Sequence, residues 1–346
     1  MKSLRFAVVG TGSIALAYEA AFAATDGAEI VAACDVRAPA VRSYAKHAGC
    51  KAYTSVRAML SGTPFDAAVV CTPPVFHEDV ACELLRCGKH VLCEKPLAIS
   101  LRAALHMLAT AAQYGTILTM ASKFRYAADV RKCRELVLSG AIGELVFVEN
   151  AFTSHVDMRR RWNSDSSVSG GGVLIDNGTH AVDILRYFLG NLCDIQVVEG
   201  RKMQDLPVED TVRLFVHNER GVMGSADLSW SIDKELETYL RVYGSAGTIL
   251  VGWKTSKFRR QGETEWQTFG SGYDKIQAFR DQIDNFSGAI RGTSELIVTP
   301  TDGLASVRVI QAAYAALARA RWERIDSERE TVHAETGIVE REMVAS

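Results

Sequence analysis

The sequence lacks a long apolar run. Its apolar stretches are all shorter than the ~20 residues that a membrane-spanning helix requires. The first five residues lead directly into a strand-like pattern, with no long apolar core and cleavage site of the kind that marks a signal peptide. We therefore expect neither a membrane partner nor a secretory leader.

Paired cysteines are also absent, since none of the eight cysteines belongs to a C-x-x-C pair. The cysteine spacing does not support a structural zinc site, and we expect no bound metal. Cys34, Cys71 and Cys93 each end an apolar segment typical of a buried strand, where a small thiol fills space. This usage favours reduced thiols in a cytoplasmic protein.

An excess of charge of one sign, internal repeats and low-complexity segments are missing as well. The 346 residues carry a formal net charge of −2, with 48% hydrophobic and 23% charged residues. Such a balance gives no reason to expect nucleic acid as a partner. The length suits two globular domains with cores of their own.

A glycine-rich turn stands near the start of the chain. It reads Gly10-Thr11-Gly12-Ser13-Ile14-Ala15, after a predicted strand at 4–9 and before a predicted helix at 14–24. G-x-G-x-x-A in this context is a dinucleotide-binding fingerprint, in which the helix N-terminus faces the pyrophosphate. We predict cofactor contacts from Gly10, Gly12, Ser13 and Ile14.

An acidic residue, Asp35, follows the predicted second strand at 29–34. It lies 20 residues after Ala15, where a carboxylate can hold the ribose hydroxyls of adenosine. The alternative is a solvated carboxylate at a strand end. A carboxylate would repel a 2′-phosphate, which favours NAD, whereas the nearby Arg37 could accommodate that phosphate and keeps NADP open.

Two further buried-strand patterns, at 66–71 and 90–93, end in residues that break regular structure. They run into Thr72-Pro73-Pro74 and Glu94-Lys95-Pro96 respectively. Ligands of open parallel sheets bind outside the carboxyl ends of the strands, and a lysine there can stabilise an alkoxide or move a proton. On its own, the histidine that follows the first break is more typical of a capping or solvated residue. We predict a cofactor cleft walled by Thr72, Pro73, His77, Glu94 and Lys95.

The order of the predicted elements indicates an α/β protein with two domains. Four or five strands alternate with helices over residues 1–121, which predicts a doubly wound parallel sheet. Strand patterns dominate after residue 144, which predicts a large open, mostly antiparallel sheet within an α/β domain at 122–325. Residues 326–346 are rich in Glu and Arg, and we expect them to form a weakly ordered tail.

A helical pattern follows three glycines at 170–172 and carries Asp176, His180 and Asp183. Residues three and four apart share a helix face, so these side chains should point the same way. An Asp beside a His fixes the imidazole tautomer and raises its basicity, which suits a general base for an alcohol. Three alternatives remain: an N-cap role for Asp176, a satisfied core histidine, and a metal site that lacks a second well-placed histidine.

Together these motifs resemble the glucose-fructose oxidoreductase / inositol dehydrogenase / rhizopine catabolism (Gfo/Idh/MocA) family. The resemblance covers nearly the whole chain and rests on the fingerprint at 10–15, Thr72-Pro73-Pro74, Glu94-Lys95-Pro96 and Asp176-x-Gly178-x-His180-x-x-Asp183. It implies an N-terminal Rossmann domain that binds NAD(P) and a C-terminal domain whose open sheet commonly forms the interface of a homodimer or homotetramer. It also implies hydride transfer to or from a secondary alcohol or ketone of a sugar, a cyclitol or a derivative.

The same resemblance implies roles for single residues. Lys95 would lie beside the reacting carbon and the nicotinamide, and Asp176 with His180 would form the proton-accepting dyad, although Lys95 and His180 could exchange roles. The segment at 122–126 departs from the usual Asn-x-Arg-Phe form and offers a lysine and an arginine instead. For the basic run at 159–161, a solvated loop competes with binding of an anionic substrate group. We expect substrate contacts from Lys95, Lys123, Arg125, Arg161, Trp162, Asp176 and His180.

Two other functions remain open within this family. Some members bind the nucleotide but act as regulators without turnover, and others use the nicotinamide transiently to cleave glycosidic bonds. The presence of both Lys95 and His180 favours a dehydrogenase over a regulator.

Overall fold

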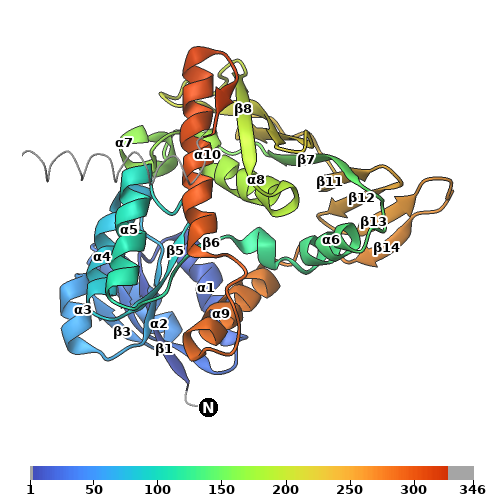
Figure 1. Ribbon diagram of the computed structural model, residues 1–346. Coiled ribbons are helices and arrows are strands. Elements are labelled where there is room, and N and C mark those ends of the chain that lie inside the picture. Colours follow the sequence, from blue (N-terminus) through green and yellow to red (C-terminus); the bar gives the residue numbers. More distant parts are fainter. Residues whose placement is uncertain (1–2, 326–346) are drawn as a thin grey trace, which may run out of the picture.

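The computed structural model describes residues 3–325, so the predicted tail at 326–346 lies outside the described residues. Two sheets are stacked one above the other, and the long helix α10 (Pro300–Arg319) runs past both of them (Figure 1). Among the described residues, no helix combines the length and the apolar character needed to cross a membrane.

The first sheet contains six strands within the described residues, in the order β3-β2-β1-β4-β5-β6, and every pair is parallel. The predicted doubly wound parallel sheet is therefore confirmed. The prediction fell short by one strand, since β3 has only three residues and so shows no pattern of its own. The strands are β1 (Leu4–Val9), β2 (Ala28–Cys34), β3 (Lys51–Tyr53), β4 (Ala67–Val70), β5 (His90–Glu94) and β6 (Leu118–Ala121).

Helices cover both faces of this sheet because its strands are apolar on both sides. In β1, Phe6 and Val8 belong to one buried cluster, whereas Ala7 and Val9 belong to another. The first cluster is closed by α1 (Ser13–Ala23), α2 (Ala38–Ala48) and α9 (Lys275–Arg291). The second is closed by α3 (Val56–Gly62), α4 (His77–Arg86) and α5 (Leu101–Gln113).

Helix α9 comes from the last quarter of the chain yet packs on the first sheet, beside α1 (Figure 1). Its Phe279 ring meets the Tyr18 ring edge-on at a centroid distance of 4.7 Å, and Phe286 lies 6.2 Å from Phe6. The two halves of the sequence therefore share a core, and residue 121 separates the two sheets rather than two independent packing units.

The second sheet has the order β14-β13-β12-β11-β7-β10-β9-β8-β15, and among the described strands only β7 and β10 run parallel. The predicted large, mostly antiparallel sheet is confirmed. Strands after residue 244 were missed, since pieces such as Ser-Lys-Phe-Arg-Arg are short and largely polar. The strands are β7 (Leu145–Thr153), β8 (Leu192–Glu199), β9 (Thr211–Asn218), β10 (Met223–Ser229), β11 (Thr238–Gly244), β12 (Gly247–Gly252), β13 (Ser256–Arg260), β14 (Gln267–Gly270) and β15 (Glu323–Arg324).

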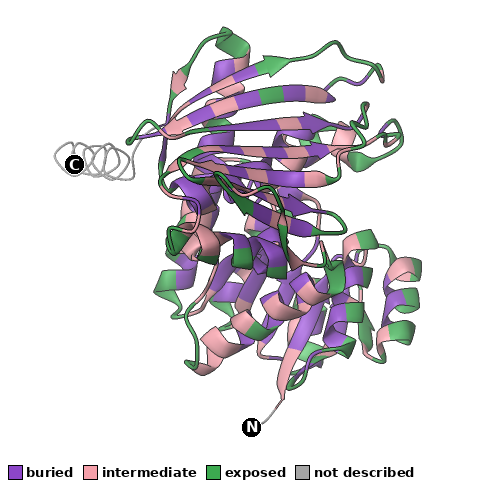
Figure 2. Cartoon of the chain, turned by 90° about the vertical axis from the view of Figure 1, so that its right-hand side faces the viewer, coloured by how far each residue is buried: buried purple, intermediate pink, exposed green. Residues whose placement is uncertain are grey.

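Helix α8 (Val173–Leu189) covers one face of the second sheet, against β7, β9 and β10, and α10 joins it over β8. Buried residues alternate along the strands with partly exposed ones (Figure 2). The described helices thus leave the opposite face of the sheet open. Short elements complete the fold: η1 (Pro74–Phe76), η2 (Lys123–Tyr126), α6 (Ala128–Leu138), η3 (Trp162–Ser164) and α7 (Ser166–Ser169).

The packing of α9 predicts a stability difference between two isoleucines on that helix. Ile283 is fully buried against the first sheet, whereas Ile276 keeps 37% of its surface exposed. Ile283→Ala should lower the free energy of unfolding by about 2–5 kcal/mol, because it removes buried methyl groups and leaves a cavity. Denaturant unfolding measures this change. Ile276→Ala is the matched control, and equal losses for the two variants would contradict the packing described here.

Candidate active site

A cavity of about 550 Å³ opens between the two sheets. Gly12, Thr72 and Lys95 reach it from the carboxyl ends of β1, β4 and β5 in the first sheet. Asp176 and His180 reach it from α8, and Lys123 from η2. Residues predicted from separate motifs thus line one space, which lies at the reversal of strand order where open α/β sheets bind ligands.

The fingerprint forms the end of this cavity next to α1. Gly10 has a φ of 90°, and a Cβ there would lie 2.6 Å from the carbonyl carbon of Cys71, so the close approach of β1 to the end of β4 requires glycine. Gly12 is the N-cap of α1 without a side-chain cap, and nothing lies within 4 Å of a Cβ built there. The Thr72 hydroxyl is buried and has no partner within the described residues. The N–H groups at the start of α1 and the Thr72 hydroxyl are hydrogen-bond donors that fit an anionic pyrophosphate.

Asp35 follows β2 beside the fingerprint. Its carboxylate accepts hydrogen bonds from the Thr11 amide at 2.9 Å and the Thr11 hydroxyl at 3.0 Å, and pairs with Arg37 Nη2 at 3.1 Å. Burial alone would raise the pKa of Asp35, but the hydrogen bonds from Arg37 and Thr11 lower it to about 2. The carboxylate is therefore ionised, and it holds the arginine that could otherwise receive a 2′-phosphate.

His77 does not wall the cavity as predicted. It is fully buried, and its ring nitrogens lie 2.9 Å from the Pro96 carbonyl oxygen and 2.8 Å from that of Thr72. Burial lowers the pKa of this histidine. His77 therefore ties the loop after β4 to the loop after β5, where the Lys95–Pro96 peptide bond is cis, and supports the cleft from behind. Four other residues predicted to contact the cofactor also do not line the main cavity, namely Gly10, Asp35, Arg37 and Pro73.

The Lys95 ammonium forms the central contact of the site. It lies 2.5 Å from Asp176 Oδ1 and donates to the Asp176 carbonyl oxygen at 3.1 Å, which joins β5 of the first sheet to α8 of the second. The prediction that the Asp176 carboxylate pairs with His180 is wrong. Within the described residues this carboxylate contacts Lys95 instead. The ion pair with Lys95 holds that carboxylate.

His180 is held by aromatic rings. Its ring meets Phe124 edge-on at a centroid distance of 5.1 Å and Phe152 at 6.3 Å. Its Nδ1 is buried and has no partner within the described residues. Burial, followed by the positive charges of Lys95 and Lys123, lowers the pKa of His180 well below its usual value. The expected increase in basicity is therefore wrong, and the imidazole is neutral at ordinary pH, with a nitrogen able to accept a proton.

Glu94 and Lys123 are two further charged groups at the cavity. Glu94 accepts a hydrogen bond from the Tyr18 hydroxyl at 2.9 Å, and Gln282 donates to that hydroxyl at 3.0 Å. Burial raises the pKa of Glu94. The Lys123 ammonium lies over the Phe124 ring at 5.2 Å from its centroid, and burial lowers its pKa to about 8.

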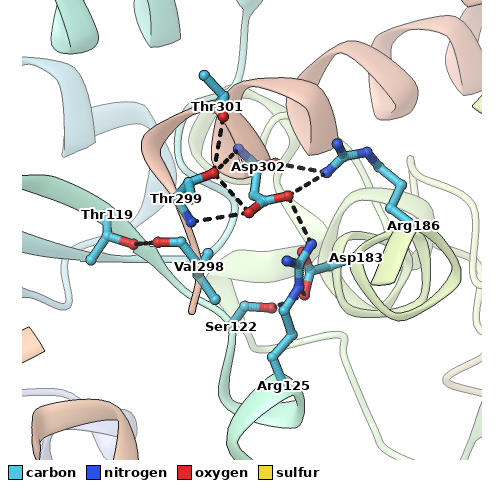
Figure 3. Close-up of polar contacts among 9 residues, drawn as sticks. All are labelled: Thr119, Ser122, Arg125, Asp183, Arg186, Val298, Thr299, Thr301 and Asp302. Atoms are coloured by element: carbon cyan, nitrogen blue, oxygen red, sulfur yellow. Dashed lines mark hydrogen bonds and ion pairs between the residues drawn. The ribbon is translucent and has the colours of Figure 1, made fainter. Parts of the chain in front are cut away.

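Arg125 was predicted to bind substrate, and the structure contradicts this. Its guanidinium is buried, with Nη2 at 2.7 Å from Asp183 Oδ1 and 3.2 Å from Asp302 Oδ1 (Figure 3). Arg186 joins at 3.3 Å from the same Asp302 oxygen, and Asp302 completes the capping box that starts α10. Asp183 therefore faces this network and not the cavity. The network fixes η2, α8 and α10 to one another, and so places Lys123 opposite Asp176 and His180.

The three glycines before α8 have a packing role. A Cβ at Gly171 would collide with the Tyr314 hydroxyl, and a Cβ at Gly172 would collide with the Glu209 backbone. The Glu209 carboxylate accepts hydrogen bonds from the Gly172 amide at 2.9 Å, the Leu174 amide at 3.0 Å and the Tyr314 hydroxyl at 2.8 Å. The N-terminus of α8 is thus capped by a buried carboxylate from a distant segment, which excludes Asp176 as its N-cap.

Arg161 and Trp162, two of the predicted substrate contacts, line the cavity on its far wall, together with aromatic residues that the sequence analysis missed. Strands β7, β10 and β12 all run in the same direction, so their carboxyl ends meet at one edge of the second sheet. Phe152 lies at the end of β7, Trp230 follows β10, and Trp253 follows β12. An aromatic residue at the end of each strand could have indicated this wall of the cavity. That inference, however, requires the directions of the strands to be known.

The described residues contain no cluster of three or more His, Cys, Asp or Glu side chains arranged to hold a metal ion.

Comparison with known protein families identifies the chain. Residues 4–122 match the oxidoreductase family with an NAD-binding Rossmann fold, and residues 130–250 match the GFO/IDH/MocA C-terminal domain. The chain therefore belongs to the GFO/IDH/MocA oxidoreductase family, and its first domain is an NAD-binding Rossmann domain. The resemblance drawn from the motifs is confirmed.

Individual relatives share about a third or fewer of their aligned residues with this chain. The chain is 27% identical to 1,5-anhydro-D-fructose reductase of Ensifer adhaerens, over 88% of this chain and 93% of that protein. It is 34% identical to D-glucoside 3-dehydrogenase of Escherichia coli, over 54% of each chain. The crystal structure of levoglucosan dehydrogenase in complex with NADH superposes with a TM-score of 0.88 at 17% identity, covering 94% of this chain and 100% of that one, which shows a shared fold.

The buried network at Arg125 predicts a large loss of stability on its disruption. Arg125→Met leaves the Asp183 carboxylate buried without its cation, which should lower the free energy of unfolding by about 3–5 kcal/mol. Arg159→Met provides the control, because the Arg159–Asp157 pair is solvent-exposed and such pairs contribute about 1 kcal/mol or less. Chemical denaturation compares the two. A loss at Arg125 no larger than that at Arg159 would refute a structural role for the network.

Proposed function

We propose that this oxidoreductase transfers a hydride between a nicotinamide cofactor and a secondary alcohol or ketone of a sugar, a cyclitol or a sugar derivative. One observation carries the proposal. The Lys95–Asp176 ion pair and the neutral His180 share one cavity with Gly12 of the nucleotide fingerprint. The two enzyme relatives described above act on sugar derivatives by their names, which supports this substrate class.

The cofactor, when bound along the fingerprint, supplies the hydride acceptor for the carbinol carbon. Lys95 donates a hydrogen bond to the substrate hydroxyl and stabilises the negative charge that develops on its oxygen. Asp176 restrains the Lys95 ammonium through the 2.5 Å contact, so the cation is in place before the substrate arrives. His180 accepts the hydroxyl proton, since its burial keeps the imidazole unprotonated.

A substrate screen tests the proposal. Cyclitols, free sugars, sugar phosphates and nucleotide sugars are incubated with NAD⁺ or NADP⁺, and the nicotinamide absorbance is followed. We expect reduced cofactor to form with at least one sugar or cyclitol. Sugar release without net NADH would indicate a glycosidase, and tight NADH binding without turnover of any compound would indicate a regulator.

Loss of Lys95 should strongly slow catalysis without abolishing cofactor binding. Lys95→Ala removes the group that stabilises the developing alkoxide, and removal of one such donor typically lowers kcat by about 10²–10³-fold. Steady-state kinetics measures the loss, and titration with NADH fluorescence checks that the cofactor still binds. The exposed Lys46→Ala is the matched control. Full turnover in Lys95→Ala would eliminate this assignment.

The ion pair at the end of β2 predicts how the cofactor preference can be changed. Asp35→Ser removes the carboxylate that repels a 2′-phosphate and frees Arg37 to bind it. The ratio of kcat/KM for NADP⁺ to that for NAD⁺ should rise at least about tenfold, which corresponds to about 1.4 kcal/mol. In the double variant Asp35→Ser/Arg37→Ala this gain should disappear. An unchanged ratio in the single variant would place cofactor selection elsewhere.

We further propose that the protein acts in the cytoplasm as a homodimer or homotetramer that associates through the open face of the second sheet. All eight cysteines are free thiols in the structure, which suits a reducing compartment. The open face mixes aromatic with charged groups, such as Tyr243, which donates to Glu149 at 2.9 Å, and the Arg213–Asp227 pair. Light scattering gives the mass of the assembly, and cell fractionation gives the compartment.

A further inference from the structure

The far end of the cavity contains an aromatic surface that the proposed reaction does not use. Three of the five tryptophans of the chain, Trp162, Trp230 and Trp253, line this one cavity. Trp162 keeps 46% of its surface exposed and Trp253 keeps 40%. Large aromatic faces that stay open in a concave site, among a few polar groups, are typical of ring recognition.

Trp253 belongs to an aromatic cluster of the second sheet, at the end of β12. Its ring contacts Tyr239 at a centroid distance of 4.5 Å and Phe152 at 6.3 Å, and Phe152 in turn contacts His180 at 6.3 Å. Phe152 therefore contacts both rings, whereas Trp253 and His180 make no ring contact with each other within the described residues. A substrate ring that reacts beside His180 would leave the Trp253 face free for a further ring.

Trp162 is presented from a separate segment, the loop around η3. Within the described residues its ring makes no contact with the aromatic group of Phe152, Trp253 and His180. Local hydrogen bonds set the loop, since the Ser164 hydroxyl donates to the Arg161 carbonyl oxygen at 2.8 Å and the Asp165 amide to that of Trp162 at 3.0 Å. Met158, at the start of the loop, is buried and anchors it. The loop that carries the indole is therefore held by its own contacts.

Polar side chains stand beside these rings. Ser154 and Asn163 line the cavity, and their side chains form no hydrogen bond within the described residues. A hydroxyl and an amide next to open indole faces match a sugar-like ring, whose C–H face is apolar and whose edge carries hydroxyls.

We propose that the far end of the cavity, defined by Trp162, Trp253, Ser154 and Asn163, is a subsite for a second ring of the substrate. The substrate is then a glycoside, oxidised on its sugar ring beside Lys95 and His180 while its aglycone ring lies against the two tryptophans. This inference rests on the proposed function and specifies its substrate class.

The test compares each free sugar of a panel with its methyl and phenyl β-glycosides and with a disaccharide. For the wild-type protein, kcat/KM should be at least about tenfold higher for the phenyl glycoside or disaccharide than for the free sugar. Trp162→Ala and Trp253→Ala should each lower this preference at least about fivefold. Trp322→Ala is the matched control, because Trp322 is 48% exposed and contacts His217 of β9, away from the cavity.

Several results would overturn the subsite. One is a preference for the free sugar, and another is an equal loss for the free sugar and the glycoside in both tryptophan variants. A third is a preference for a sugar phosphate that Arg161→Gln abolishes, since this would assign the far end to an anionic group. If no sugar is oxidised, the proposed reaction is refuted. The subsite is then tested separately, by measuring the binding of the same compounds with calorimetry. Tighter binding of the phenyl glycoside, lost in Trp162→Ala, would support it, and absence of this difference would refute it.

Discussion

The ion pair between Lys95 and Asp176 is the contact on which the site depends. Lys95 ends a strand of the first sheet and Asp176 lies in the helix that covers the second, so the pair joins the two halves across the cavity. Neither residue is fully exposed, and the ammonium also donates to the Asp176 backbone. The position of the proposed alkoxide-stabilising group is therefore set by both domains, and a change in their relative placement would move it away from its partner.

The same lysine also sets the state of the histidine. Lys95 and Lys123 both disfavour a positive charge on His180, in addition to its burial. Because the Asp176 carboxylate pairs with Lys95, it does not stabilise an imidazolium in the manner of a carboxylate–histidine dyad. The arrangement favours a neutral proton acceptor beside a cation, which suits an alcohol that must lose a proton as negative charge develops on its oxygen.

The sequence was sufficient for the parts of the structure that depend on local pattern. The fingerprint at 10–15, the ends of the buried strands and the face shared by Asp176 and His180 all follow from spacing, and the structure brings Gly12, Lys95, Asp176 and His180 to one cavity. Contacts between distant segments could not be read in this way. Arg125 had the right type and place for a substrate contact, but its partners Asp183 and Asp302 lie 58 and 177 residues away in the chain. His77 likewise binds two loops whose approach only the folded chain defines.

The two ends of the cavity are built from different parts of the fold. The end beside Lys95 is built from strand ends of the first sheet and from α8, and its position is locked by buried ion pairs at Arg125 and by the carboxylate of Glu209. The far end is built from the carboxyl ends of β7, β10 and β12 and from the η3 loop. The Gln204 side chain joins the segment before this loop to the end of β10, through hydrogen bonds to the backbone of Val156, Met158 and Trp230. A fixed reaction centre beside a wall of loop and strand-end residues allows the chemistry to stay constant while the recognised group varies, because substitutions at the wall leave the ion pairs of the centre intact. On the roles proposed above, substrate choice would depend mainly on Trp162, Trp253 and their polar neighbours, and the reaction type on Lys95, Asp176 and His180.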